Sequence, residues 1–168
     1  DSITAGDLYN AGAPLTTSLG KSYADHDARI FNFSWGSTAN VYDDDPQDID
    51  KFIFDNPDAM VFVSAGNNGG QDQNDDGLED PLTLGSPATT KNGLAIGASR
   101  NANVRVNSPE SREAFSSHGP AVDFANVNRI APQLMAPGGE PGGGALGISS
   151  EFACRSGDND QNDPVQCD

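Results

Sequence analysis

The stretch from Met60 to Gly70 joins an apolar run to a group of small residues and an amide. "MVFVS" is followed by Ala65, Gly66 and Asn67, then by a second asparagine and two glycines. A carboxamide that is held rigidly beside a reacting carbonyl can donate a hydrogen bond to the negative charge that develops there. Asparagine is also common in plain turns, because it tolerates a positive φ. Asn67 therefore has two interpretations, an oxyanion donor or a turn residue.

The loop after this turn carries alternating oxygen donors. They are Asp72, Asn74, Asp76 and Asp80. With Gly77 at the sharp turn, this spacing is typical of the opening of calcium loops of the EF-hand type. Thr83 stands where such a loop has its bidentate acid. We predict a structural calcium site at these four donors, with a solvated acidic loop as the alternative.

Two cysteines, Cys154 and Cys167, flank a polar stretch near the end of the chain. A zinc site would need more thiols or neighbouring histidines. We therefore predict a disulfide that closes a surface loop in an oxidising compartment, with two free thiols as the alternative. The acidic residues 158–163 between the cysteines lack a glycine, and a polar loop explains them.

The overall charge is strongly negative, with 9 Lys and Arg against 25 Asp and Glu, a net charge of −16. Nucleic acid is excluded as a partner because few groups could neutralise phosphates. The balance suits calcium binding, salt-rich surroundings or solubility. No apolar run approaches the roughly 20 residues that span a bilayer. The 168 residues suffice for one domain with a core.

Helices and strands alternate in the first two thirds of the chain. We expect helices at about 16–28, capped by Thr16 or Thr17, and at 45–57, capped by Asp45 with Pro46 as first helical residue. In the first helix, Leu19, Tyr23 and Ala24 would share one face. The expected strands are 28–36, 59–66 and 93–99, and shorter extended pieces follow at 113–124 and 129–139.

Near-continuous apolar strands that alternate with helices predict an α/β fold, with a parallel sheet covered on both faces. In such sheets ligands bind beyond the carboxyl ends of the strands. Ser34-Trp35-Gly36 and Ala65-Gly66-Asn67 follow two successive strands, so we expect them to meet at one edge of the sheet.

Four sequence blocks occur in an order that resembles the subtilisin-like serine proteases. They are "ARIFNFSWGS", "MVFVSAGNNG", "LGSPATTKNGLAIGAS" and "FSSHGPA" with "RIAPQLMAPGG". The resemblance is strongest over residues 15–140. It implies a three-layer subtilisin-like fold that is incomplete at both ends, as a single domain with an acidic insert at 68–84 and a loop-rich tail at 141–168.

The resemblance also implies roles for the residues at the sheet edge. Asn67 matches the asparagine whose amide stabilises the oxyanion. Ser34, Trp35 and Gly36 match the segment that pairs with the peptide substrate as an added strand. Ser64, Ala65 and Gly66 match one wall of the primary specificity pocket. Gly85 matches its floor, and small residues there imply space for a large apolar side chain.

The family's three triad motifs are not found in this sequence. The nucleophile string G-T-S-M-A is absent, and the nearest match, Gly147-Ile148-Ser149-Ser150, has the wrong continuation. The two histidines, His26 and His118, do not lie in H-G-T-H. We therefore expect the central part of a peptidase domain, inactive by itself, whose partners are a peptide or protein substrate and the flanking parts of the same domain.

The predicted function is that of a secreted serine endopeptidase, a hydrolase that cleaves peptide bonds with a Ser/His/Asp triad and an Asn oxyanion hole. One alternative is a non-catalytic binding module of the same fold. Another is a calcium-dependent structural or adhesive domain, although only one D-x-N-x-D-G copy is present.

Overall fold

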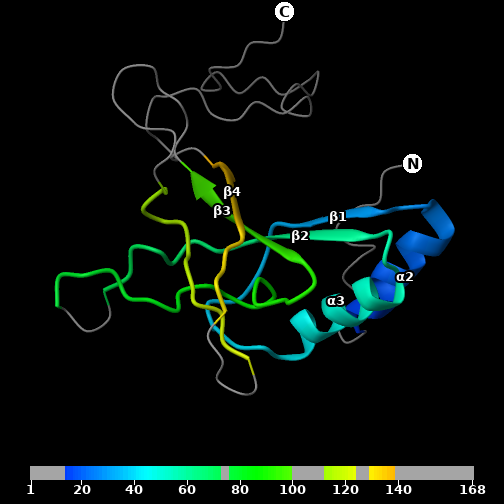
Figure 1. The fold of residues 1–168 in the computed structure, drawn as a ribbon, viewed down its shortest axis with the longest axis horizontal. Coiled ribbons are helices and arrows are strands. Elements are labelled where there is room, and N and C mark those ends of the chain that lie inside the picture. The colour runs from blue at the N-terminus through cyan, green and yellow to red at the C-terminus, as the bar shows by residue number, and fades with distance from the viewer. Residues whose placement is uncertain (1–13, 73–75, 100–111, 124–128, 139–168) are drawn as a thin grey trace, which may run out of the picture.

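The computed structural model describes residues 14–72, 76–99, 112–123 and 129–138 (Figure 1). Its elements are α2 (Leu15–His26), β1 (Ile30–Phe33), α3 (Asp44–Asp55), β2 (Met60–Ser64), β3 (Leu94–Ser99) and β4 (Leu134–Pro137). Within these residues, no helix combines the length and apolar character needed to cross a membrane.

The four strands form one sheet in the order β1-β2-β3-β4, and every neighbouring pair is parallel. The predicted α/β fold with a parallel sheet is confirmed. A parallel register places all four carboxyl ends at one edge. Residues that follow β1 therefore lie beside residues that follow β2.

The core lies between one face of the sheet and the two helices. Phe31 and Phe33 from β1, with Val61 and Val63 from β2, are buried against Leu19 of α2 and Ile49 and Phe52 of α3. The rings of Phe31 and Phe52 meet edge to face, with centroids 5.3 Å apart. Complete burial of one such side chain contributes about 1.5–3 kcal/mol. Both helices lie on the same side of the sheet in Figure 1.

The opposite face of the sheet is more exposed. Ile30 of β1 is 72% exposed, Met60 of β2 is 45% exposed and Leu134 of β4 is 52% exposed. Among the described residues, no helix packs on this face. The two described helices therefore supply one of the two covering layers that the sequence predicts.

The helix starts differ from the predicted ones. Neither Thr16 nor Thr17 caps α2, because Pro14 occupies the N-cap position and its carbonyl accepts the Thr17 N–H at 2.9 Å. Likewise Asp43, not Asp45, occupies the N-cap position of α3. Pro46 still lies in the first turn, where its missing N–H is tolerated. Both helices thus begin slightly before the predicted residue.

The buried face of α2 was also predicted incorrectly in part. Leu15, Leu19 and Ser22 are buried, whereas Ala24 is exposed. Asp27 then adopts a left-handed conformation (φ 56°), which ends the helix before Ala28. Because Leu15 starts the apolar stripe, the buried face rotates away from Ala24.

Candidate active site

A cleft of about 340 Å³ opens at the carboxyl ends of β1 and β2. It is lined by Ser34, Trp35, Gly36, Ser37, Thr38, Ser64, Ala65, Gly66, Asn67, Asn68, Gly85 and Ser86. The structure thus brings together Asn67 and all seven predicted substrate-binding residues. Ser37, Thr38, Asn68 and Ser86 were not predicted to line it, although each lies within two residues of one that was.

Backbone hydrogen bonds join the segments that form the walls of this cleft. The Ser37 N–H donates to the Ser86 carbonyl at 2.7 Å, and the Ser86 N–H donates to the Ala39 carbonyl at 3.0 Å. The Gly85 N–H donates to the Ala65 carbonyl at 3.4 Å. The segment after β1 and the segment 85–86 are therefore fixed relative to the end of β2.

Two of the predicted pocket glycines are required by the packing around them, one by a neighbouring backbone group and one by its positive φ and a neighbouring side chain. A Cβ at Gly85 would lie 1.8 Å from the Ser37 carbonyl oxygen. Gly66 has a φ of 110°, and its Cβ would lie 2.9 Å from the Ser117 Oγ. The missing side chains of Gly85 and Gly66 thus make room for Ser37 and Ser117, so these two glycines are needed for the packing of the protein itself.

The Asn67 side chain is exposed at the cleft, and it forms no hydrogen bond with any described residue. Its neighbour differs, because the Asn68 carboxamide oxygen accepts a hydrogen bond from Gln71 Nε2 at 3.1 Å. Asn68 thus stabilises its own loop, whereas the Asn67 amide can donate to a bound group.

The described lining of the cleft contains no ionisable side chain. The Ser86 hydroxyl lies at the cleft but donates to the Asp43 carboxylate at 2.5 Å. Trp35 is 39% exposed, and its ring packs on Phe33 with centroids 5.6 Å apart. The cleft therefore offers neutral hydrogen-bonding groups and an aromatic side chain to a ligand.

Neither histidine lines this cleft. His26 is exposed at the end of α2. His118 is partly buried, with its Nδ1 3.4 Å from the Thr83 hydroxyl and its backbone paired with Thr83 and Leu84. No hydrogen bond joins a described serine to either ring, so no triad is assembled in the part of the chain that the structure describes.

In the acidic loop, the Asp72 carboxylate accepts hydrogen bonds from backbone groups, and Asp80 takes part through its own backbone N–H. The two Asp72 carboxylate oxygens accept the N–H groups of Asp76 (3.1 Å) and Gly77 (2.8 Å). The Asp80 N–H donates to the Gln71 carbonyl at 2.8 Å. No three acidic, histidine or cysteine side chains gather as an ion site among the described residues.

Several predicted site residues lie outside the described ranges. Asn74, which completes the proposed calcium donors, is one of them, as are Cys154 and Cys167. The calcium site and the disulfide therefore remain predictions.

Comparisons with known proteins place the chain in a family. The model of the subtilase family, peptidase S8, matches residues 4–163. A serine protease/ABC transporter B family protein, tagD, from Dictyostelium discoideum is 32% identical over 133 residues, covering 76% of this chain and 5% of that protein.

Similar solved structures carry the names of proteases. The prenylagaramide maturation protease PagA is 21% identical with a TM-score of 0.46, and the alignment covers 74% of this chain and 36% of that one. Sphericase is 18% identical with a TM-score of 0.49 (73% and 37% covered). Pseudomonas sedolisin, a serine-carboxyl proteinase, is 18% identical with a TM-score of 0.49 (77% and 44% covered).

The chain thus spans less than half the length of each of these relatives. The match to the family model nevertheless extends over nearly all of its residues. The chain belongs to the subtilase family of serine proteases.

Proposed function

We propose that this chain forms the oxyanion-binding and substrate-binding part of a serine endopeptidase. The observation that carries the proposal is the exposed Asn67 amide, which lines a neutral cleft together with the segment after β1. Membership of the subtilase family supports the same reaction class.

Asn67 acts on the charge that forms during peptide hydrolysis. Attack by a serine hydroxyl moves negative charge onto the substrate carbonyl oxygen. The Asn67 amide donates a hydrogen bond to that oxygen, which stabilises the transition state more than the bound substrate. Loss of one such donor lowers turnover by about 10²–10³ in subtilisin, where it has been measured.

The substrate peptide binds along Ser34, Trp35 and Gly36 as an added strand. The side chain before the scissile bond enters the cleft between Ser64–Gly66 and Gly85. Since the described lining is uncharged, an uncharged and preferably apolar side chain fits there best.

The serine, histidine and aspartate of the triad are supplied from outside residues 1–168, because the motifs that carry them are absent from this sequence. The parts of the same domain that carry them pack on the open face of the sheet, around Ile30, Met60 and Leu134. A parallel sheet is normally covered on both faces, which supports this partner. The complete protein is secreted, and residues 1–168 alone hydrolyse no peptide.

The first test measures activity with and without the flanking sequence. Residues 1–168, and the longer protein encoded around them, are incubated with a fluorophosphonate probe and with a fluorogenic peptide. We expect the longer protein to be labelled and to cleave the peptide, and we expect neither result with residues 1–168. Labelling of the 168-residue chain at one serine would refute its inactivity, and a longer protein without G-T-S-M-A would favour a binding module.

The second test replaces the amide in the active protein. Asn67→Ala should lower kcat by about 10²–10³ while KM changes little, because the hydrogen bond forms in the transition state. Asn68→Ala is the matched control and should leave kcat within about threefold, since its side chain bonds to its own loop. Equal effects of the two variants would contradict the role of Asn67.

A further inference from the structure

One buried serine binds both peptide groups that flank Asn67. The Ser117 N–H donates to the Gly66 carbonyl at 3.0 Å, and the Ser117 Oγ accepts the Asn68 N–H at 2.9 Å. Ser117 is fully buried and lies far from Asn67 in the sequence. The peptide on each side of the Asn67 Cα is therefore held by the same residue.

The fit between this serine and the turn is tight. At Gly66, where φ is 110°, an added Cβ would lie 2.9 Å from the Ser117 Oγ and 3.5 Å from its Cβ. The Ser117 side chain thus lies directly against the turn. A bulkier residue at position 66 would displace the hydroxyl that binds Asn68.

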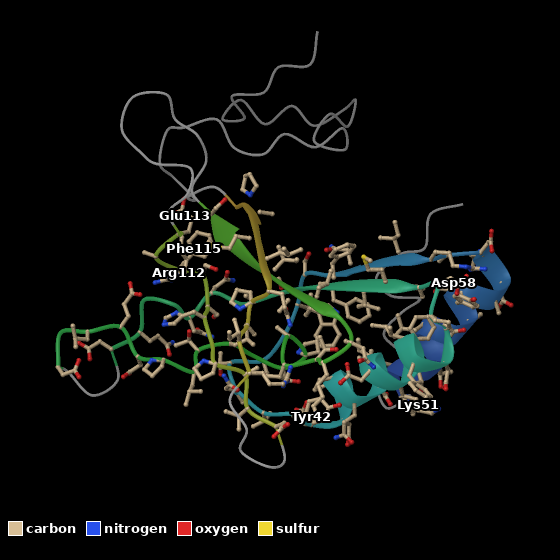
Figure 2. All side chains as sticks on the ribbon, in the orientation of Figure 1. Tyr42, Lys51, Asp58, Arg112, Glu113 and Phe115 are labelled. Atoms are coloured by element: carbon tan, nitrogen blue, oxygen red, sulfur yellow. The ribbon has the colours of Figure 1, made fainter. Side chains whose placement is uncertain are left out.

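The segment that carries Ser117 is itself firmly held. Arg112 Nη1 donates to the carbonyls of Glu113 (3.0 Å), Ala114 (3.1 Å) and Ser116 (2.6 Å). The Gly69 N–H donates to the Phe115 carbonyl at 2.9 Å. Figure 2 shows Arg112, Glu113 and Phe115 close together near the end of β3.

We propose that Ser117 is the positioning residue that fixes the direction of the Asn67 amide in the cleft. Two bonded peptide planes define the orientation of the Asn67 Cα, and hence of its Cβ. A donor to an oxyanion is effective when its geometry is set before the reaction, and misplacement by a fraction of an ångström weakens it. This inference rests on the proposed role of Asn67 as that donor.

The neighbouring serine provides a matched control. Ser116 is as buried as Ser117, and its Oγ also accepts a backbone N–H, that of Ala98 in β3 at 2.9 Å. No hydrogen bond links the Ser116 hydroxyl to the described residues 66–68. Ser116→Ala and Ser117→Ala therefore remove the same chemical group from the same segment, and only Ser117→Ala frees the Asn67 turn.

The first experiment measures amide hydrogen exchange by NMR in the 168-residue chain. Ser117→Ala should accelerate exchange of the Asn68 N–H, whereas the Gly69 N–H stays protected by Phe115. Ser116→Ala should instead accelerate exchange of the Ala98 N–H. Ser117→Cys fills the position with a slightly larger side chain that is only a weak acceptor, and it should act like Ser117→Ala if the alanine variant does not fold. Unchanged Asn68 exchange in a folded variant overturns the proposal.

The second experiment is a double-mutant cycle in the active protein. Ser117→Ala should lower kcat by about tenfold with KM within about twofold, and Ser116→Ala should leave both nearly unchanged. In an Asn67→Ala background, Ser117→Ala should cost nothing further, because its effect passes through that amide. The same loss in both backgrounds overturns the proposal. If Asn67→Ala alone leaves kcat unchanged, the proposed function fails, and hydrogen exchange still decides whether Ser117 holds the turn.

Discussion

Gly85 allows two segments of the cleft to pack closely, because it has a hydrogen atom where other residues have a side chain. Gly85→Ala would place a Cβ 1.8 Å from the Ser37 carbonyl oxygen, so the two segments must separate. We expect the free energy of unfolding to fall by about 1–3 kcal/mol, as for overpacked cores. Urea denaturation measures this change.

Gly20, inside α2, is the control for this variant. Apart from the adjacent residues and the backbone of the helix itself, nothing lies within 4 Å of the position that a Cβ would take there. Gly20→Ala should therefore raise the free energy of unfolding by about 0.5–1 kcal/mol through helix propensity. A loss of stability at both positions would show that the cleft geometry is not the cause at Gly85.

The environment of Tyr42 predicts that the free energy of unfolding falls at alkaline pH. Burial of the Tyr42 side chain, together with its hydrogen bond to Asp50 Oδ2 at 2.6 Å, raises its pKa above the usual 10.0. A raised pKa in the folded state means that this stabilisation is complete below about pH 10 and is lost as pH rises above it. Tyr42→Phe should be less stable at neutral pH but should lose less stability above pH 10.

The measurement for Tyr42 is urea denaturation as a function of pH, with tyrosinate absorbance recorded in parallel. Tyr23 serves as the internal comparison, because its pKa is also raised, by a hydrogen bond to the Asp58 carboxylate. An unchanged alkaline profile in Tyr42→Phe would contradict the assignment.

At the scale of elements, one buried carboxylate joins α3 to the turn before β3. Asp50 accepts hydrogen bonds from the Thr90 hydroxyl (2.5 Å) and from the N–H groups of Lys91 (2.8 Å) and Asn92 (2.7 Å). The Tyr42 hydroxyl also donates to it. Figure 2 shows Tyr42 at the start of α3, and it labels Lys51 on the helix itself. The segment that begins at Gly85 is thus anchored to the helix layer.

Asp50→Ala should lower the free energy of unfolding by at least about 3 kcal/mol, because several buried donors lose their acceptor. Thermal and urea denaturation measure the loss. The control is Asp55→Ala on the same helix, where the exposed ion pair with Lys51 should contribute under about 0.5 kcal/mol. Similar losses in both variants would contradict the anchoring role.

For the molecule as a whole, the net charge of −16 means that any cation stabilises the fold by screening the repulsion between carboxylates. Calcium is predicted to stabilise it further by binding at a specific site. At constant 0.15 M potassium chloride, calcium at about 100 times its Kd should stabilise the fold by about 2.7 kcal/mol. Differential scanning calorimetry measures the accompanying rise in Tm.

Asp72→Asn should abolish most of this calcium effect, because Asp72 is the first predicted donor. The asparagine variant keeps one oxygen that can accept a backbone N–H and loses the second of the two bonds that the carboxylate makes. Magnesium serves as the cation control. A Tm that does not change with millimolar calcium would contradict a site.

Helices, strands and the sheet edge at Asn67 could be predicted because they depend on local patterns. Apolar runs such as Met60–Ser64 predicted the strands, and the small residues after them predicted the edge of the sheet at which the structure has its cleft. The fourth strand, Leu134–Pro137, was expected only as an extended piece, since proline and glycine surround it and its pairing with β3 supplies the missing stability. The helix starts were displaced because Pro14 and Asp43 take the N-cap positions.

The amino-acid sequence by itself determined the α/β class, the family and the residues that carry the amide and the cleft backbone, since each resides in a short continuous stretch. Tertiary structure alone decided that Ser117 binds both sides of Asn67 and that Gly85 faces Ser37. It also decided that both described helices cover one face of the sheet. These contacts join segments far apart in the chain, and their geometry depends on how the whole core packs.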